Sequence, residues 1–120
     1  MLPAMKIFKE AAFEAAHRLP NVPPGHRCHN LHGHNYRVRV ECEGPLDPKL
    51  GWVCDFAEVD AAMAPILKAL DHKYLNEVAG LENPTSEMIA AWILERLRKG
   101  PLPVARLTVW ENDSCGAVAE

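Results

Sequence analysis

The stretch HGHNYRVRVECE, residues 32–43, decides the fold, because apolar and charged side chains alternate along most of its length. The apolar side chains share one parity and the charged ones the other: Tyr36, Val38, Val40 and Cys42 against Arg37, Arg39, Glu41 and Glu43. In a strand, successive side chains point to opposite faces of the sheet. Residues 35–43 are therefore predicted to form a half-buried antiparallel strand.

Further strands are predicted on both sides of this one. Residues 5–17 are expected to form a strand with a bulge between Phe8 and Phe13, because these two rings have opposite parity. The proline-rich residues 19–25 are predicted to form a loop. Residues 51–54, GWVC, follow a turn region rich in proline and are interpreted as a short return strand.

Two helices are predicted in the second half of the chain. Asp55 begins a pattern typical of a capping box, which predicts a helix over residues 56–70 with a kink at Pro65. A second helix begins around residues 84–87 and ends at Gly100. Its apolar face is formed by Ile89, Trp92, Ile93 and Leu97. Residues 104–111 are predicted to form a last long strand, and the tail through Cys115 is a candidate for a short one.

The order of elements predicts an α+β fold. Three strands, two consecutive helices and a final strand indicate an antiparallel sheet with both helices packed on one face. The length of 120 residues fits a single domain over residues 1–120. Because such a small sheet leaves edge strands exposed, a homo-oligomer that pairs these edges is expected.

Composition excludes several classes of partner. A net charge of −3 gives no bulk electrostatic reason to expect a nucleic acid. No apolar run approaches the roughly 20 residues that span a bilayer. Residues 1–14 lack the order of a secretory signal, and the four cysteines form no CxxC pair. We therefore expect reduced thiols in a cytoplasmic protein that does not enter a membrane.

Three histidines are candidates for one metal site. His32 and His34 are two residues apart at the start of the predicted strand, so their imidazoles project from the same face. His17, at the end of the preceding strand, is available as a third ligand. Three histidines with an open fourth position are typical of catalytic zinc, although imidazole also suits iron, copper and nickel. From the pattern alone, His26 and His29 are equally eligible as ligands.

Other residues have chemistry that the local sequence leaves open. Cys28 is either a fourth zinc ligand, which would close the site, or a free thiolate that acts as base or nucleophile. Asp71 and His72 form either an acid/base relay or an ordinary helix C-terminus, and the pair alone favours the second reading. Glu111 either emerges into solvent at the end of a strand or anchors a ligand that offers paired N–H groups, and solvent is favoured.

Taken together, six features resemble the 6-pyruvoyltetrahydropterin synthase family. They are FEAAHRLP, Cys-x-x-x-HGHNY, GWVCDFAEV, LDHKYLN, LENPTSE and the glutamate of the late strand. They run in the family's order from Phe8 to Glu111. Three residues separate Cys28 from the HGH, which is most similar to the bacterial 6-carboxytetrahydropterin synthases of the queuosine pathway. Members that make 6-pyruvoyltetrahydropterin typically place the cysteine further away, and a third group has glutamate there.

The resemblance implies a role for each candidate residue. His17, His32 and His34 would bind Zn²⁺, and Cys28 would be the catalytic general base rather than a ligand. Asp71 and His72 would form the relay that protonates the other face of the substrate. Glu111 would bind the pyrimidine edge of a pterin, with Thr85 nearby. The resemblance assigns no role to the tail NDSCGAVAE.

The resemblance also implies the assembly and the reaction. The family has the tunnelling fold, in which trimers close their sheets into a barrel and two trimers stack into a homohexamer. Active sites between subunits would then combine Cys28 of one chain with Asp71 and His72 of another. The implied reaction converts 7,8-dihydroneopterin triphosphate to 6-carboxytetrahydropterin, with release of triphosphate and acetaldehyde. The alternatives are a 6-pyruvoyltetrahydropterin synthase, or a non-catalytic zinc module with Cys28 as fourth ligand.

Overall fold

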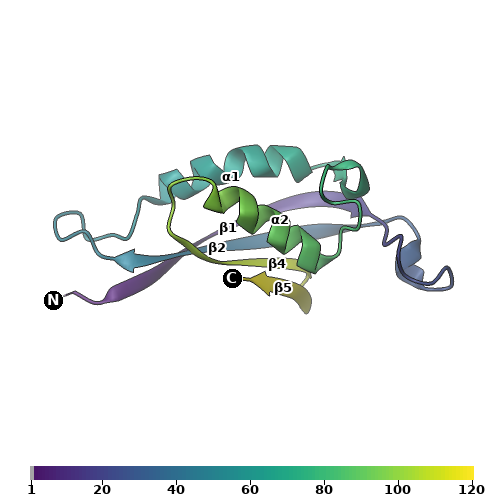
Figure 1. Cartoon of the computed structure of the whole chain (residues 1–120), viewed down its shortest axis with the longest axis horizontal. Helices are drawn as coiled ribbons and strands as arrows, with labels where there is room; N and C mark the ends of the chain where they lie inside the picture. Colours follow the sequence, from purple (N-terminus) through teal and green to yellow (C-terminus); the bar gives the residue numbers. More distant parts are fainter. Residues whose placement is uncertain (1) are drawn as a thin grey trace.

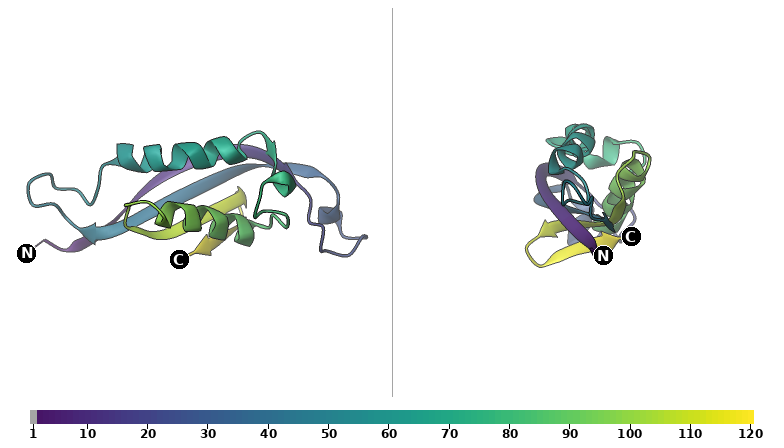
Figure 2. Two further views of the ribbon diagram at one scale, coloured as in Figure 1. Left: turned by 45° about the horizontal axis from the view of Figure 1, so that its top comes forward. Right: turned by 90° about the vertical axis from the view of Figure 1, so that its left-hand side faces the viewer.

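The computed structural model describes residues 2–120 as a five-stranded sheet with two helices on one face (Figures 1 and 2). In chain order the strands and helices are β1 Ala4–His17, β2 His32–Pro45, α1 Phe56–Leu70, β3 Lys73–Tyr74, α2 Ser86–Arg98, β4 Val104–Asn112 and β5 Cys115–Ala119. Two short 3₁₀ turns, η1 Arg27–His29 and η2 Leu75–Glu77, complete the set. The α+β class and the helices on one face are confirmed.

The sheet has the strand order β3-β1-β2-β4-β5 and is mixed rather than purely antiparallel. Strand β3 pairs with β1 in parallel, and the other neighbours are antiparallel. The cause is the path of the chain. Because α1 follows β2 after a reversal, it runs in the direction of β1, and β3 continues that direction after only two residues. The predicted tail strand is confirmed as β5.

Strands β1 and β2 pair in one unbroken register, from Ala4 opposite Pro45 to His17 opposite His32. The predicted bulge between Phe8 and Phe13 is therefore wrong. The two rings have opposite parity because they serve opposite faces of the sheet. Phe13 is buried under the helices and Phe8 is 55% exposed on the uncovered face. Irregularities occur instead where β4 pairs with β2 and with β5.

The predicted strand at residues 51–54 is also wrong, because this segment forms a bend before α1. Asp47 organises the bend: its carboxylate accepts the N–H groups of Lys49 and Leu50 at 2.9 and 2.8 Å. Its own N–H donates to the carbonyl of Trp52 at 2.9 Å. Hydrogen bonds within the loop thus replace the expected pairing with a strand.

Both predicted helices are confirmed, with side-chain caps at their first turns. Asp55 accepts the N–H of Ala57 at 2.9 Å, and α1 continues without interruption through Pro65. Thr85 caps α2 by accepting the N–H of Met88 at 3.1 Å. No helix within residues 2–120 is long and apolar enough to cross a membrane.

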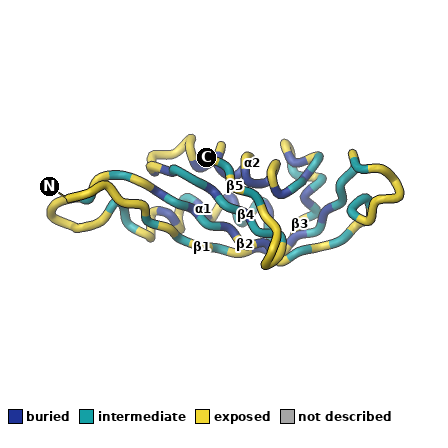
Figure 3. The backbone as a smooth tube through the Cα atoms, turned by 90° about the horizontal axis from the view of Figure 1, so that it is seen from below, coloured by how far each residue is buried: buried dark blue, intermediate teal, exposed yellow. Residues whose placement is uncertain are grey.

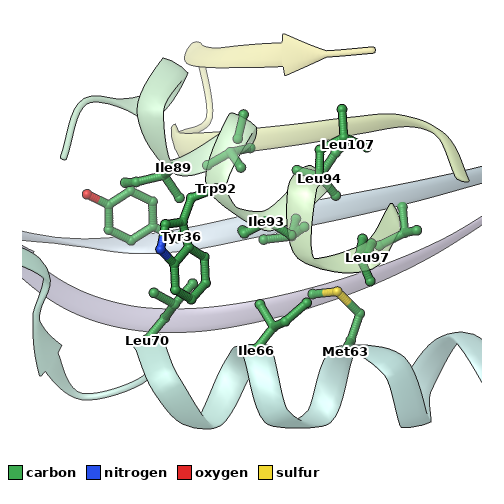
Figure 4. Close-up of a cluster of buried hydrophobic side chains, with 14 of the residues drawn as sticks. Tyr36, Met63, Ile66, Leu70, Ile89, Trp92, Ile93, Leu94, Leu97 and Leu107 are labelled. Carbon is green, nitrogen blue, oxygen red and sulfur yellow. The ribbon is translucent and has the colours of Figure 1, made fainter. Parts of the chain in front are cut away.

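The core lies between the helices and the sheet, as Figure 4 shows for side chains from α1, α2, β2 and β4. The alternation predicted for β2 is present in the structure. All four of its apolar side chains are buried: Tyr36, Val38, Val40 and Cys42. Exposed segments gather at the two ends of a molecule that measures 57 × 24 × 21 Å (Figure 3). One end carries the loop of residues 18–31 and the other the loop of residues 46–55 (Figure 1).

Candidate metal centre and active site

The β1–β2 ladder brings the three predicted metal ligands together. His17 ends β1 directly opposite His32, and His34 projects from the same face two residues later. The Nε2 atoms of His17 and His32 are 3.0 Å apart. One ligand atom from each of the three rings lies within 4.8 Å of the others. His17 is only 1% exposed, so the cluster is closed on the side that faces the core.

The second nitrogen of two of these rings is held by backbone carbonyls. His17 Nδ1 lies 2.8 Å from the carbonyl of Pro84, and His32 Nδ1 lies 2.7 Å from that of Asn30. Because a carbonyl only accepts, each Nδ1 carries the proton and each Nε2 keeps a free lone pair. Burial lowers the pKa of His17 and of His34, which favours the neutral rings that bind metals.

This geometry fits a divalent ion. In tetrahedral zinc sites with bonds near 2.0–2.1 Å, ligand nitrogens lie roughly 3.3 Å apart, close to the 3.0 Å between His17 and His32. The three histidines could hold a metal, and their imidazoles suit zinc, iron, copper or nickel. Carbonyl partners behind two of the rings are the usual outer support of such a centre.

A cavity of about 410 Å³ opens over the cluster. It is lined by His17, Leu19, Arg27, Cys28, His32, His34, Glu111, Asn112 and Cys115. The half-buried Cys28 comes from η1 and lines the same cavity as all three histidines and Glu111. Cys115 begins β5, the tail strand for which the sequence suggested no functional role, and the β4–β5 hairpin brings it to the cavity.

Glu111 is held inside the site rather than released into solvent. Its Oε2 accepts a hydrogen bond from the hydroxyl of Ser86 at 3.1 Å and lies 3.8 Å from His34 Nε2. Ser86 is buried at 7% exposure, and sequence reasoning missed it in favour of its neighbour Thr85. The Thr85 hydroxyl is engaged with the N–H of Met88, so its contact with a substrate stays a prediction. The sequence signal that could have indicated Ser86 is its hydroxyl side chain, one position after the helix cap Thr85.

Asp71 and His72 form a close pair away from this cavity. His72 Nδ1 is 3.0 Å from Asp71 Oδ1, which also accepts the N–H of Glu14 at 3.0 Å. That N–H and the His72 imidazole hold the pKa of Asp71 below its usual range. The His72 side chain is 74% exposed and lines a second hollow, which shares His34 with the first cavity but includes neither Cys28 nor Glu111. Within one chain, therefore, the pair does not join Cys28.

The fold and this cluster define a tunnelling-fold protein with a three-histidine site able to bind a metal. The family model of 6-pyruvoyl tetrahydropterin synthase matches residues 6–120. The chain belongs to the 6-pyruvoyl tetrahydropterin synthase family. A solved 6-pyruvoyl tetrahydropterin synthase from Caenorhabditis elegans superposes with a TM-score of 0.86 at 29% identity, covering 93% of this chain and 91% of that one.

Relatives in the family are named for different activities. A 6-carboxy-5,6,7,8-tetrahydropterin synthase of Synechocystis is 44% identical, over 81% of this chain and 78% of that protein. A dihydroneopterin monophosphate aldolase of Pyrococcus furiosus is 36% identical over 96% of both. The human 6-pyruvoyl tetrahydrobiopterin synthase is 32% identical, over 91% of this chain and 86% of that protein.

The backbone of His72 is left-handed, with φ of 58°, and its N–H donates to the carbonyl of Glu14 at 2.6 Å. Because a Cβ is strained in this region, His72→Gly is expected to be more stable than His72→Ala by about 1 kcal/mol. Urea unfolding of the two variants measures the difference. Equal stabilities would show that the left-handed backbone is not maintained in solution.

Proposed function

We propose that this protein is a zinc-dependent lyase that converts 7,8-dihydroneopterin triphosphate to 6-carboxytetrahydropterin, with release of triphosphate and acetaldehyde. This reaction would be a step in queuosine biosynthesis, carried out in the cytoplasm by a domain that spans residues 1–120. The observation that carries the proposal is the shared cavity of Cys28, Glu111 and the three-histidine cluster. The name of the Synechocystis relative supports the choice of reaction.

His17 and His32 would hold the zinc through Nε2 atoms that face one another, with a ring nitrogen of His34 as the third ligand. When bound, the ion supplies positive charge that acidifies the hydroxyl groups of the substrate side chain. The carbonyl of Pro84 keeps His17 in the tautomer that this role needs. Since Cys28 is not needed to complete the three-histidine set, its thiol is left free for proton transfer.

Cys28 acts in this proposal as the general base that moves a proton between the side chain and the ring of the pterin. Glu111 orients the substrate, because a carboxylate accepts two parallel hydrogen bonds from the N–H groups of a pyrimidine edge. Ser86 donates to one oxygen of this carboxylate, which fixes the direction in which Glu111 faces. Thr85, at the start of the same helix, is proposed to lie near the bound pterin.

His72 acts as the complementary acid, and Asp71 holds its ring through Nδ1. The pair is exposed, and the hollow that His72 lines contains neither Cys28 nor Glu111, so we propose that the pair serves the cavity of a neighbouring subunit. A homohexamer built as a dimer of trimers would bring the two parts together. The exposed edge of β5 and the two-residue edge strand β3 support such pairing between copies.

The alternative is a 6-pyruvoyltetrahydropterin synthase, which would use the same cavity without the loss of two carbon atoms. The match of 36% to the Pyrococcus aldolase favours one further candidate, an aldolase that acts on dihydroneopterin monophosphate. The residues of the cavity suit all three reactions, because each needs a proton moved next to a pterin ring.

Product analysis separates these reactions. Purified protein loaded with zinc is expected to release triphosphate and acetaldehyde in equal amounts from 7,8-dihydroneopterin triphosphate, with 6-carboxytetrahydropterin as the pterin product. Mass spectrometry and an acetaldehyde assay make the measurement. Formation of 6-pyruvoyltetrahydropterin without acetaldehyde would contradict the proposal. Turnover of dihydroneopterin monophosphate alone would favour the aldolase.

Substitution of Cys28 tests its role against that of a ligand. Cys28→Ala is expected to keep bound zinc at the wild-type ratio while kcat falls by at least about 100-fold, as for the loss of a general base. His34→Ala, the matched control, is expected to lose zinc. Metal content by atomic emission and initial rates give both readouts. Loss of zinc from Cys28→Ala would instead make the cysteine a fourth ligand.

Mixed oligomers test the sharing of sites between subunits. Cys28→Ala and His72→Ala are each expected to be inactive alone. When they are unfolded, mixed in equal amounts and refolded together, roughly a quarter of the wild-type activity should return, because random assembly pairs two intact halves at that frequency. If no activity returns from an assembly that forms normally, the two residues serve the same chain.

A further inference from the structure

We infer that His26 and His29, the two histidines of the 18–31 loop outside the metal cluster, are positioning residues for Cys28. The inference rests on the proposed function in taking Cys28 as the base, and it extends that function to residues that touch neither metal nor substrate. The carrying observation is a set of hydrogen bonds from both rings, and from Arg18 and Asn76, that fixes η1.

His26 is the residue before η1 and caps its first turn. Its ring Nδ1 accepts the N–H of Cys28 at 3.1 Å, in the manner of a helix cap. The His26 carbonyl accepts the N–H of His29 at 3.0 Å, and the His26 N–H donates to the carbonyl of Pro23 at 2.8 Å. The carbonyl of Cys28 in turn accepts the N–H of Leu19 at 2.8 Å. Both backbone polar groups of Cys28 are therefore bound.

His29 holds the other end of η1 through Arg18. The guanidinium donates from Nε to the His29 carbonyl at 3.2 Å and from Nη2 to the His29 ring at 3.1 Å. Arg18 is itself fixed by the side chain of Asn76, which accepts its N–H at 3.0 Å and donates to its carbonyl at 2.8 Å. Asn76 belongs to η2, so the loop that carries Cys28 is tied to the body of the fold.

The consequence concerns the distance between base and metal cluster. Arg18 follows His17 directly, so the bonds that run from Asn76 through Arg18 to His29 relate the position of Cys28 to that of a metal ligand. Each hydrogen bond on its own contributes little to the stability of the fold. The position of the Cys28 thiol matters more for turnover than the stability of the loop does. A displacement near 1 Å at a reacting group can lower the rate about 100-fold. We therefore expect a large effect on turnover and a small one on folding.

The experiment compares His26→Ala and His29→Ala with a rescue variant and a matched control. His26→Asn keeps a side-chain acceptor that is able to cap the N–H of Cys28. Asn21→Ala alters an exposed residue of the same loop. We expect both alanine variants to lower kcat about tenfold or more, with KM within twofold and zinc content unchanged. His26→Asn should recover most of the rate, and Asn21→Ala should match the wild type.

Two readouts without substrate keep this inference separate from the proposed function. Amide hydrogen exchange at Cys28, and the rate at which iodoacetamide alkylates this thiol, should both rise in the two alanine variants, as followed by peptide mass spectrometry. If neither changes, the inference is overturned. Loss of zinc from either alanine variant would overturn it as well, by making that histidine a ligand. If both readouts rise but the wild type does not turn over the pterin triphosphate, the proposed function fails and the positioning of Cys28 stands.

Discussion

The candidate site depends on the pairing of β1 with β2. Fourteen residues of each strand are joined in one register, and the last pair is His17 with His32. Because side chains alternate along a strand, a slip of one residue would turn the imidazoles of one strand to the opposite face. Phe13 and Tyr36 are buried and paired across the two strands, and their ring centroids are 4.8 Å apart. A slip would expose one of these rings and is therefore unfavourable. The core that stabilises the sheet therefore also sets the geometry of the three-histidine cluster.

The start of α2 is the second element on which the site depends. Pro84 accepts a hydrogen bond from the buried ring of His17, and Ser86 donates to Glu111. Three consecutive residues thus support the metal cluster, cap the helix and orient the carboxylate, with Thr85 as the cap. A shift of the helix would therefore move the His17 ring and the Glu111 carboxylate together.

Local pattern predicted the features that local physics controls. The alternation in β2, the two capped helices and the common face of His32 and His34 all depend on residues close in sequence, and the structure has them. The bulge near Phe8 and the strand at residues 51–54 were wrong. Both depended on partners that the pattern does not contain: the second face of the sheet in one case, hydrogen bonds from Asp47 in the other.

The site divides in the same way. The sequence identified Cys28 and Glu111 as candidate site residues, but it could not place them in one cavity. They are 83 positions apart in the chain, and only the folded sheet brings them together. Ser86 was missed because its partner lies on β4. The exposure of Asp71 and His72 was equally invisible, since it depends on which elements cover the edge of β1. The roles of these residues stay predictions.

The length of the β1–β2 ribbon has a consequence for how the protein can change in evolution. The histidine end and the Ala4–Pro45 end lie about 40 Å apart along the strands, at roughly 3.3 Å per residue. The bend of residues 46–55 is at the far end and contributes no side chain to the cavity. Insertions there would lengthen an exposed loop without altering the metal cluster, so this loop is free to acquire new partners or new lengths while the chemistry stays constant.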